Sequence, residues 1–177
     1  YFEDEVRLSD RLRANAGLRF SGFSNDGTTY LNLEPRLNFV FTASDQLAIK
    51  GSYARMNQYL HLVSNSGVAL PTDIWYPSTT TIRPQRSDQI ALGSSWLLAP
   101  QWRLQGEVYY KWLDQQIELV DGGQLFANDD LEREFAIGDG FAYGMELSLE
   151  KQEGRLTGWI GYTLAFVRRG NFAPVDP

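Results

Sequence analysis

The chain has 177 residues, of which none is cysteine and one is histidine. Without cysteine it cannot form a disulfide, a zinc–thiolate centre or a thiol nucleophile. Basic residues are also scarce, because 16 lysines and arginines stand against 22 aspartates and glutamates, which gives a net charge of −6. This acidic balance argues against nucleic-acid binding. No apolar run approaches the roughly 18 residues of a transmembrane helix, so the sequence does not predict a helical membrane protein.

The most prominent positive feature is an alternation of apolar and polar residues. From Leu12 to Phe20 every even position is apolar, and every odd position is polar, charged or glycine. A period of two indicates β-strands, because successive side chains of a strand point to opposite faces of its sheet. No segment shows a sustained helical period. We predict an all-β fold of about eight antiparallel strands, at residues 2–8, 12–23, 29–42, 47–56, 88–98, 102–114, 141–151 and 155–168.

The connections between the predicted strands alternate between short and long. The tight turns are 9–11, 43–46, 99–101 and 151–154, and the longer connections are 24–28, 57–87 and 115–140. In an up-and-down antiparallel sheet, alternate connections lie at the same end. All tight turns would therefore gather at one end, which is the plan of outer-membrane β-barrels with short periplasmic turns and longer extracellular loops.

Aromatic residues of the apolar face fall into two clusters separated by aliphatic residues. The cluster near the tight turns comprises Phe39, Phe41, Trp96 and Trp102. The cluster toward the longer loops comprises Phe20, Phe23, Tyr53, Tyr110, Trp112, Phe141, Tyr143, Tyr162 and Phe166. Two aromatic belts with an aliphatic band between them are typical of the two interfaces of a membrane. We therefore predict that the apolar face meets lipid and that the polar face lines a lumen.

Pro35 lies inside the third predicted strand. Proline has no N–H group to donate to a ladder of hydrogen bonds, so within sheets it is confined to edges and bulges. We therefore expect a bulge or an edge at this position.

Several short segments, taken in order, resemble the β-barrel of TonB-dependent outer-membrane receptors. They are Gly17-Leu18-Arg19, Leu33-Glu34-Pro35-Arg36-Leu37, Gly51-Ser52-Tyr53-Ala54-Arg55, Pro84-Gln85-Arg86-Ser87-Asp88-Gln89-Ile90-Ala91-Leu92-Gly93, Val108-Tyr109-Tyr110-Lys111, Gly144-Met145-Glu146-Leu147-Ser148-Leu149 and Gly158-Trp159-Ile160-Gly161-Tyr162-Thr163-Leu164. Segments 58–62 and 70–75 resemble the subgroup with a carboxypeptidase-regulatory-like extension before the plug. The ordered series covers nearly the whole chain.

The resemblance implies a 22-stranded barrel whose lumen is filled by an N-terminal plug. Because residues 1–177 show about eight strands, no plug and no TonB box, we expect a consecutive section of the barrel wall. The resemblance further implies active uptake of a scarce nutrient, such as an iron chelate, cobalamin or a glycan, across the outer membrane of a Gram-negative bacterium. The implied partners are outer-membrane lipid, the plug and remaining strands of the full-length chain, TonB through that plug, and the solute.

The polar face carries charged residues that we expect to line the lumen and to meet the plug and the solute. They are Arg19, Glu34, Arg36, Lys50, Arg103, Glu107, Lys111 and Glu146, with Arg13 and Glu150 on the same face. The alternative for any one of them is an ion-pair network that only fills the interior, because charges taken out of bulk water usually pair.

Two of the longer connections hold further candidates. At the outer mouth, aromatic and basic residues of connection 57–87 are candidates for binding a sugar or an anionic chelate, with a solvated cover loop as the alternative. These candidates are His61, Trp75, Tyr76, Arg83 and Arg86. Connection 115–140 holds seven acidic residues against one arginine. Calcium suits oxygen ligands such as those of residues 128–130, but no full ligand spacing appears, so we favour a solvated acidic loop without metal.

We expect neither an enzyme nor a cofactor. A serine–histidine–aspartate site can be drawn with Ser64, His61 and Asp73, but no nucleophile elbow or orienting pattern accompanies it. Two alternatives to a wall section stay open at this stage. One is an autonomous eight-stranded outer-membrane barrel with a structural or adhesive role, whose eighth strand would bond to its first. The other is a soluble sandwich or an enzyme built on one.

A wall section would have two open edges. Their backbone groups lack partners, which is costly in lipid and favours aggregation in water. We therefore expect residues 1–177 not to fold stably by themselves.

Overall fold

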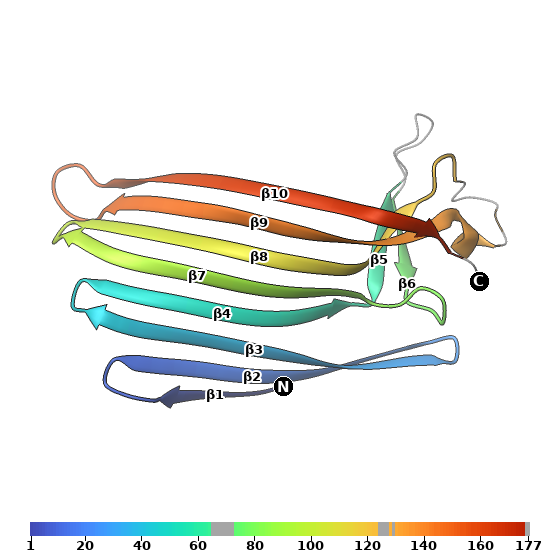
Figure 1. Ribbon diagram of the computed structural model, residues 1–177, viewed down its shortest axis with the longest axis horizontal. Coiled ribbons are helices and arrows are strands. Elements are labelled where there is room, and N and C mark those ends of the chain that lie inside the picture. The colour runs from blue at the N-terminus through green and yellow to red at the C-terminus, as the bar shows by residue number, and fades with distance from the viewer. Residues whose placement is uncertain (65–72, 124–127, 129, 176–177) are drawn as a thin grey trace.

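A computed structural model describes residues 1–64, 73–123, 128 and 130–175. The chain forms an eight-stranded antiparallel sheet of order β1-β2-β3-β4-β7-β8-β9-β10 and a separate hairpin, β5-β6 (Figure 1). The sheet strands are β1 (Phe2–Arg7), β2 (Leu12–Asn25), β3 (Thr28–Ser44), β4 (Leu47–Gln58), β7 (Gln85–Ala99), β8 (Trp102–Leu119), β9 (Phe135–Lys151) and β10 (Gly158–Pro174). The hairpin strands are β5 (Leu60–Ser64) and β6 (Asp73–Pro77), and a 3₁₀ helix, η1, covers Leu131–Glu134. The predicted all-β antiparallel fold is confirmed.

The predicted sorting of the connections by length is wrong at two places. The connection after β2, expected as a longer loop, is the two-residue turn 26–27, whereas the connection after β9, expected as a tight turn, covers residues 152–157. The turns after β1, β3, β7 and β9 lie at one end of the sheet, and the connections after β2, β4 and β8 lie at the other (Figure 1). We call the second end the outer end. No helix among the described residues is long and apolar enough to cross a membrane.

Several predicted boundaries were wrong at the outer end. Strand β8 continues to Leu119 and β9 begins at Phe135, so the predicted connection 115–140 shrinks to residues 120–134. The alternation fails there for two reasons. A bulge between Leu113 and Gln116 shifts the register, and Asp139 occupies a position where the pattern calls for an apolar residue. Strand β10 likewise extends past a bulge to Pro174, beyond the predicted end at residue 168.

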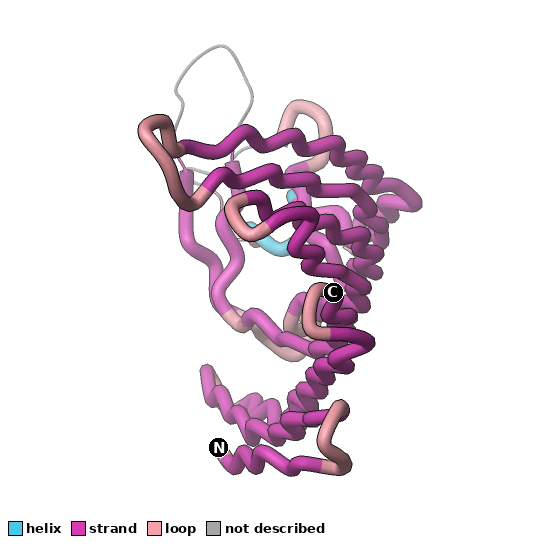
Figure 2. Tube along the Cα trace, turned by 90° about the vertical axis from the view of Figure 1, so that its left-hand side faces the viewer, coloured by secondary structure: helices cyan, strands magenta, loops and turns pink. Residues whose placement is uncertain are grey.

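The predicted connection 57–87 contains structure of its own. Strands β5 and β6 pair over five residues each, from Leu60 opposite Pro77 to Ser64 opposite Asp73. Such short strands carry too few alternations to stand out in the sequence. The hairpin lies within the hollow of the curved sheet, as the end-on view shows (Figure 2).

The position of Pro35 inside a strand is explained by the place where β3 and β4 separate. Thr42 donates its N–H to the carbonyl of Arg11 next to β2. Because N–H groups alternate between the two neighbours of an antiparallel strand, odd-numbered residues of β3 face β4. The pairing of β3 with β4 ends at Arg36, opposite Ala54, while the pairing with β2 continues through Pro35 without a register shift. Pro35 is therefore at an edge and not at a bulge.

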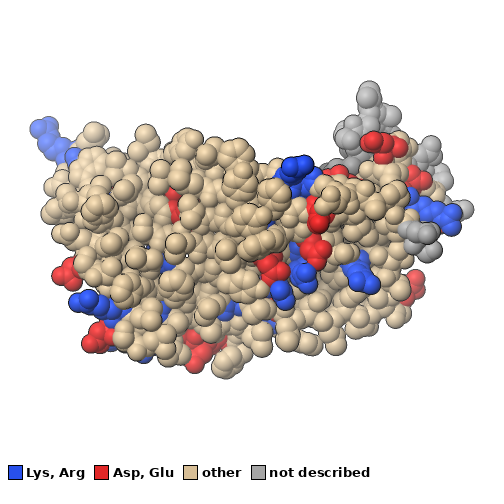
Figure 3. Space-filling model, in the orientation of Figure 1, with Lys and Arg blue, Asp and Glu red and all other residues tan. Residues whose placement is uncertain are grey.

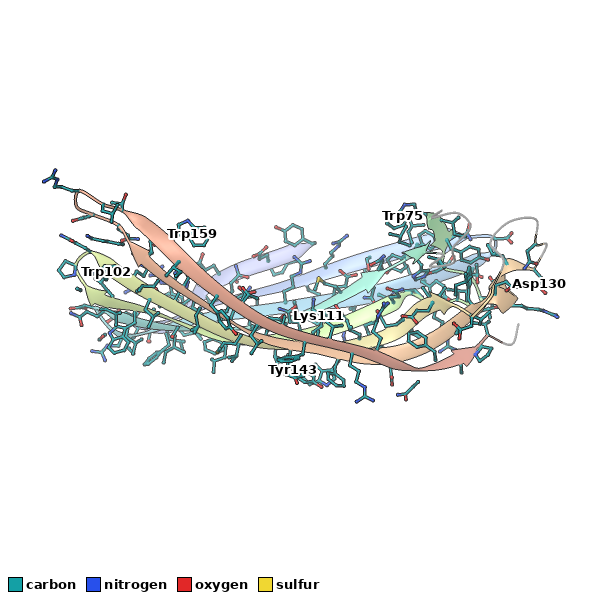
Figure 4. All side chains as sticks on the ribbon, turned by 90° about the horizontal axis from the view of Figure 1, so that it is seen from above. Trp75, Trp102, Lys111, Asp130, Tyr143 and Trp159 are labelled. Carbon is teal, nitrogen blue, oxygen red and sulfur yellow. The ribbon has the colours of Figure 1, made fainter. Side chains whose placement is uncertain are left out.

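The strand register divides the side chains between two faces. Rows of opposed residues place all eight predicted lining residues on one face; for example, Lys50 lies opposite Gly93, which lies opposite Glu107. This face is concave, and Lys111 lies on its side of the sheet, whereas Tyr143 lies on the convex side (Figure 4).

The convex face is apolar and uncovered. Leu92 and Val108 at its centre are 53 % and 49 % exposed, and Ile160 on the edge strand β10 is 70 % exposed. In Figure 3 this face is turned to the viewer; most of it is tan, and one group of charged side chains lies right of its centre, on the side of the outer end. Among the described residues, the buried hydrophobic cluster is a small one at the outer end, built from Val63, Ile82, Ile117 and Phe135. A single sheet that leaves so wide an apolar surface open is not a soluble sandwich.

The sheet does not close on itself. Strands β1 and β10 form its two edges, and within the described part of the chain they do not pair with each other. This finding excludes the alternative of a closed eight-stranded barrel. It agrees with the predicted section of a larger wall.

Candidate functional site

The outer end carries a cap that joins two connections far apart in the sequence. We define the outer cap as the β5-β6 hairpin, residues 78–84 and η1. Val63 and Ile82 pack in it against Ile117 of β8 and Phe135 of β9, all at most 5 % exposed. The ring of Tyr76 meets that of Phe135 edge-on, with centroids 4.9 Å apart. Apolar burial therefore fixes the hairpin to the rim of the sheet.

Glu132 of η1 ties the same two connections together by hydrogen bonds. The hydroxyl of Tyr76 donates to Glu132 Oε1 at 3.0 Å, and that of Thr79 donates to the same oxygen at 2.5 Å. Burial, with the hydrogen bond to Glu132 next in size, raises the pKa of Tyr76 to about 12. The acidic connection is thus part of the cap's structure at this residue, and the sequence carried no signal for that role.

His61 of β5 is fully buried within the outer cap. Its Nε2 lies 3.0 Å from Ser78 Oγ, and within the described structure its Nδ1 has no hydrogen-bond partner. Burial lowers the pKa of His61 to about 4, so the ring is neutral at physiological pH. The side chains of Ser64 and Asp73, with which a catalytic site could be drawn, lie outside the described residues. Solvent does not reach this histidine.

The five candidates for solute recognition do not form one cluster. His61 and Tyr76 point into the cap, whereas Trp75 lies on the other face of the hairpin, where it is 64 % exposed (Figure 4). Leu60 and Leu62 share that exposed face. Of the five, Trp75 is therefore the aromatic ring that is open to the concave side.

The two arginines of the set differ from each other. Arg86 lies in β7, where its guanidinium donates to Asp114 of β8 at 2.7 Å and lies 3.7 Å from Asp88. Asp88 also accepts bonds from Arg55 and from the Tyr53 hydroxyl. Arg83 precedes β7, is exposed, and forms no ion pair with any described residue.

Glu34 is the most buried charge of the predicted lining. It is 2 % exposed and accepts hydrogen bonds from Ser21 Oγ at 2.9 Å and from the backbone N–H of Asn57 at 3.2 Å. Arg19 lies 3.7 Å from its other oxygen. Glu34 thus joins β2, β3 and β4 at the place where β3 and β4 part, so its position favours a structural role.

Tyr59 extends this cluster toward the cap. Its hydroxyl lies 2.7 Å from Ser21 Oγ and accepts a bond from Asn32 at 3.0 Å. Its ring stacks on Phe23 with centroids 5.3 Å apart. Phe23 therefore lies on the concave face, and its assignment to the outer aromatic belt was wrong. Its odd position, shared with Ser21, was the signal in the sequence.

A row of charged side chains crosses the centre of the concave face. Glu107 and Glu146 are directly opposed across β8 and β9, and Lys50 lies in the same row. The described residues form no ion pair with these three, nor with Arg36, Arg103 or Lys111. A hollow of about 350 Å³ opens over the row. Gly93 and Gly161 line it, and their lack of side chains leaves this space free.

Stacked aromatic rings mark the convex face below the outer end. Tyr110, Tyr143 and Phe166 lie side by side on β8, β9 and β10, with centroids 6.3 Å and 5.2 Å apart. Phe141 stacks on both tyrosines. Four of the nine residues of the predicted outer belt therefore form a ladder of rings across three strands.

The predicted calcium alternative cannot be assembled from the described residues. Asp129 lies outside them, and Asp130 pairs with Arg133 at 2.6 Å. No group of three or more histidine, aspartate or glutamate side chains among the described residues could hold a metal ion.

Comparison with known proteins gives two kinds of match. Residues 1–176 match the family model of the TonB dependent receptor-like β-barrel. Two solved structures of the FrpB iron transporter from Neisseria meningitidis, the F3-3 variant and the apoprotein form of the F5-1 variant, are similar in fold. Each has a TM-score of 0.68 and 16 % sequence identity; the matches cover 94 % and 99 % of this chain. Comparison with curated proteins found no match. The chain spans about a quarter of the transporters' length, 25 % and 26 %.

Proposed function

The chain belongs to the family of TonB-dependent receptor-like β-barrels, and from this premise we propose that it forms part of the wall of an outer-membrane nutrient transporter. The remaining strands of the full-length protein complete the barrel, and a plug fills it. TonB acts through the plug. The solute is a scarce nutrient such as an iron chelate, cobalamin or a glycan, and the membrane is that of a Gram-negative bacterium.

The convex face is the observation that carries this proposal. It is apolar across the sheet, it is open to the surroundings, and aromatic residues border it toward both ends. Lipid is the medium in which such a surface is stable, and its aromatic borders suit the two interfaces. The open edges favour a larger barrel, because unpaired backbone groups are costly in a bilayer.

The test is the full-length gene and its deletion. We expect sequence encoding a plug and further strands on either side of residues 1–177, and we expect the protein in the outer-membrane fraction. Deleting the gene should abolish energy-dependent uptake of one nutrient among labelled iron chelates, cobalamin and glycans. Flanking sequence with neither a plug nor further strands would disprove the proposal.

The concave face supports a plug as the partner on that side. Glu107 and Glu146 face each other without a cation among the described residues, and like charges directly opposed destabilise a sheet. A basic side chain from the plug, entering the hollow between them, would remove this repulsion. We therefore assign the row of Lys50, Glu107 and Glu146 to plug contact and not to solute binding.

Replacing both glutamates tests this assignment. The double variant Glu107→Gln, Glu146→Gln should weaken the docking of the plug and raise its susceptibility to added protease in the full-length receptor. The matched control is Glu153→Gln, which removes an exposed carboxylate at the opposite, tight-turn end. Equal plug protection in the double variant and the wild type would contradict the assignment.

Trp75 is the residue we assign to the solute. It is exposed on the side of the hairpin that carries Leu60 and Leu62, within the hollow of the wall. An aromatic ring flanked by aliphatic side chains suits the apolar part of a chelate or the face of a sugar. Trp75→Ala should raise the half-saturating solute concentration for uptake, whereas Leu31→Ala on the convex face should not.

A further inference from the structure

A second hollow lies at the outer end, where β3 and β4 part beyond Arg36. Its volume is about 210 Å³, and we call it the β3–β7 notch. Its lining includes Tyr30, Asn32, Asn57, Arg83, Arg86 and Gln115. The notch exists because the wall loses one strand pairing at Pro35 while β3 continues outward.

Hydrogen bonds to neighbouring elements hold the walls of the notch. The hydroxyl of Tyr30 donates to the carbonyl of Thr79 at 2.5 Å. Asn32 donates one amide hydrogen to Tyr59, and Asn57 donates to Glu34 at 3.3 Å. The shape of the notch is thus set before any ligand arrives, which lowers the entropic cost of binding.

Arg83 supplies an uncommitted positive charge. The notch is lined by two arginines and one aspartate, and Asp114 neutralises Arg86 at 2.7 Å. Arg83 forms neither an ion pair nor a hydrogen bond with the residues that the structure describes. A guanidinium carries five N–H donors in a planar fork that matches a carboxylate or a phosphate. The net positive charge of the lining is therefore carried by the Arg83 guanidinium, whose geometry suits oxyanions.

Gln115 is a further polar group on the lining of the notch. Its φ is +57°, in the left-handed region that a residue with a side chain rarely adopts. It stands in the bulge of β8 that re-aims the following side chains, and it lines the notch. Its side-chain amide carries two N–H donors on the same lining as Arg83.

We propose that the β3–β7 notch binds a single oxyanion group, a carboxylate or a phosphate, with Arg83 as its principal ligand. Gln115 and the second amide hydrogen of Asn32 complete the donors. The proposal rests on the proposed function in one respect, because it identifies the bound group as the anionic part of the transported solute. The phosphate of an outer-leaflet lipid carries the same chemistry and is the other possible source.

The binding test uses the full-length receptor, purified in detergent. Inorganic phosphate and citrate are titrated into the wild type, Arg83→Ala, Arg83→Lys and the control Arg155→Ala, whose arginine is exposed at the tight-turn end. We expect saturable binding of at least one anion by the wild type and by the control. The variant Arg83→Ala loses the charge-assisted hydrogen bonds between the guanidinium and the anion, so its affinity for the anion should fall by about tenfold or more. Lysine should restore part of the affinity, because it keeps the charge but lacks the fork.

Two further arms separate the sources. In bilayers that contain phosphatidylglycerol, the lipid is tested as a competitor of inorganic phosphate for the notch. Competition that is seen in the wild type but not in Arg83→Ala would identify a lipid phosphate as the ligand. Without such competition, Arg83→Ala should raise the half-saturating solute concentration for uptake, which identifies the solute.

Two results would overturn the site. These are a wild type that binds neither anion saturably and an Arg83→Ala variant that binds as tightly as the wild type. Either result, with wild-type uptake intact, leaves the proposed function in place. Absence of the wild type from the outer membrane would instead contradict the proposed function, while the titration stays readable.

Discussion

The sheet and the outer cap treat apolar side chains in opposite ways. In the sheet, Leu92 and Val108 stay about half exposed on the convex face, at 53 % and 49 %. In the cap, Phe135 and Ile82 are 0 % and 1 % exposed and belong to the same buried hydrophobic cluster. One chain thus follows two rules of burial, and the rule changes with the medium. Under the proposed function, lipid covers the convex face of the sheet, whereas the cap stands outside the membrane and therefore has a core of its own.

The largest effect should come from the cap's core. Phe135→Ala leaves a cavity that should cost about 3–5 kcal/mol of local stability. Hydrogen exchange of the full-length receptor should show faster exchange in β5, β6 and η1. Phe20→Ala is the control, because Phe20 is 62 % exposed on the convex face and its loss leaves no internal cavity. Equal exchange in both variants would remove the distinction between the two regions.

A charge on the convex face should have the next largest effect. Leu92→Arg places a guanidinium near the middle of the apolar band, which should cost about 2–4 kcal/mol in a bilayer. Gln105→Arg puts the same charge on the concave face and should cost little, because that side is polar. Urea unfolding of the receptor in lipid vesicles measures both. Similar losses would show that the convex face does not meet lipid.

Acid should weaken the cap and spare the sheet. The pKa of His61 is lowered to about 4, so the cap favours the neutral ring. Stability is complete above about pH 6.5 and falls as the pH drops toward 4, at about 1.4 kcal/mol per unit and about 3 kcal/mol in total. Hydrogen exchange of β5 between pH 7 and 4, corrected for intrinsic rates, should show the loss. His61→Gln, which cannot titrate, should give a flat profile; a sloping one would disprove the mechanism.

The smallest effect should come from the cap's polar tie. Glu132→Gln keeps an acceptor oxygen but removes its charge, which should cost about 1–2 kcal/mol of cap stability. The pKa of Tyr76 should fall from about 12, as followed by tyrosine absorbance against the variant Tyr76→Phe. Glu153→Gln, at the other end of the molecule, is the control. An unchanged pKa of Tyr76 would show that Glu132 does not act on it.

The sequence predicted the sheet well because the pattern and the fold share a period of two. The strand from Leu12 and the lining from Arg19 to Glu146 both follow from local alternation. It failed at Gln115 and Asp139, where a bulge and a polar residue break that alternation. Local pattern carries no record of such interruptions before the pairing is known.

The cap could not be predicted for a different reason. Its core joins Val63 and Ile82 of one connection to Phe135 beyond the other, so its contacts are between distant parts of the sequence. The recognition of the receptor family is confirmed by the match over residues 1–176. The subgroup with a carboxypeptidase-regulatory-like extension stays a prediction.

The ladder of rings on the convex face has an optical consequence. Tyr110 and Tyr143 are almost parallel, at 6°, and Tyr143 and Phe166 are inclined by 26°. Aromatic rings held in fixed, asymmetric packing contribute circular dichroism in the near ultraviolet, so this part of the wall should give such a band. A slip of one residue between β8 and β9 would send Phe141 and Tyr143 to the other face and weaken the band. The near-ultraviolet circular dichroism of these rings therefore reports whether β8 and β9 pair in the correct register.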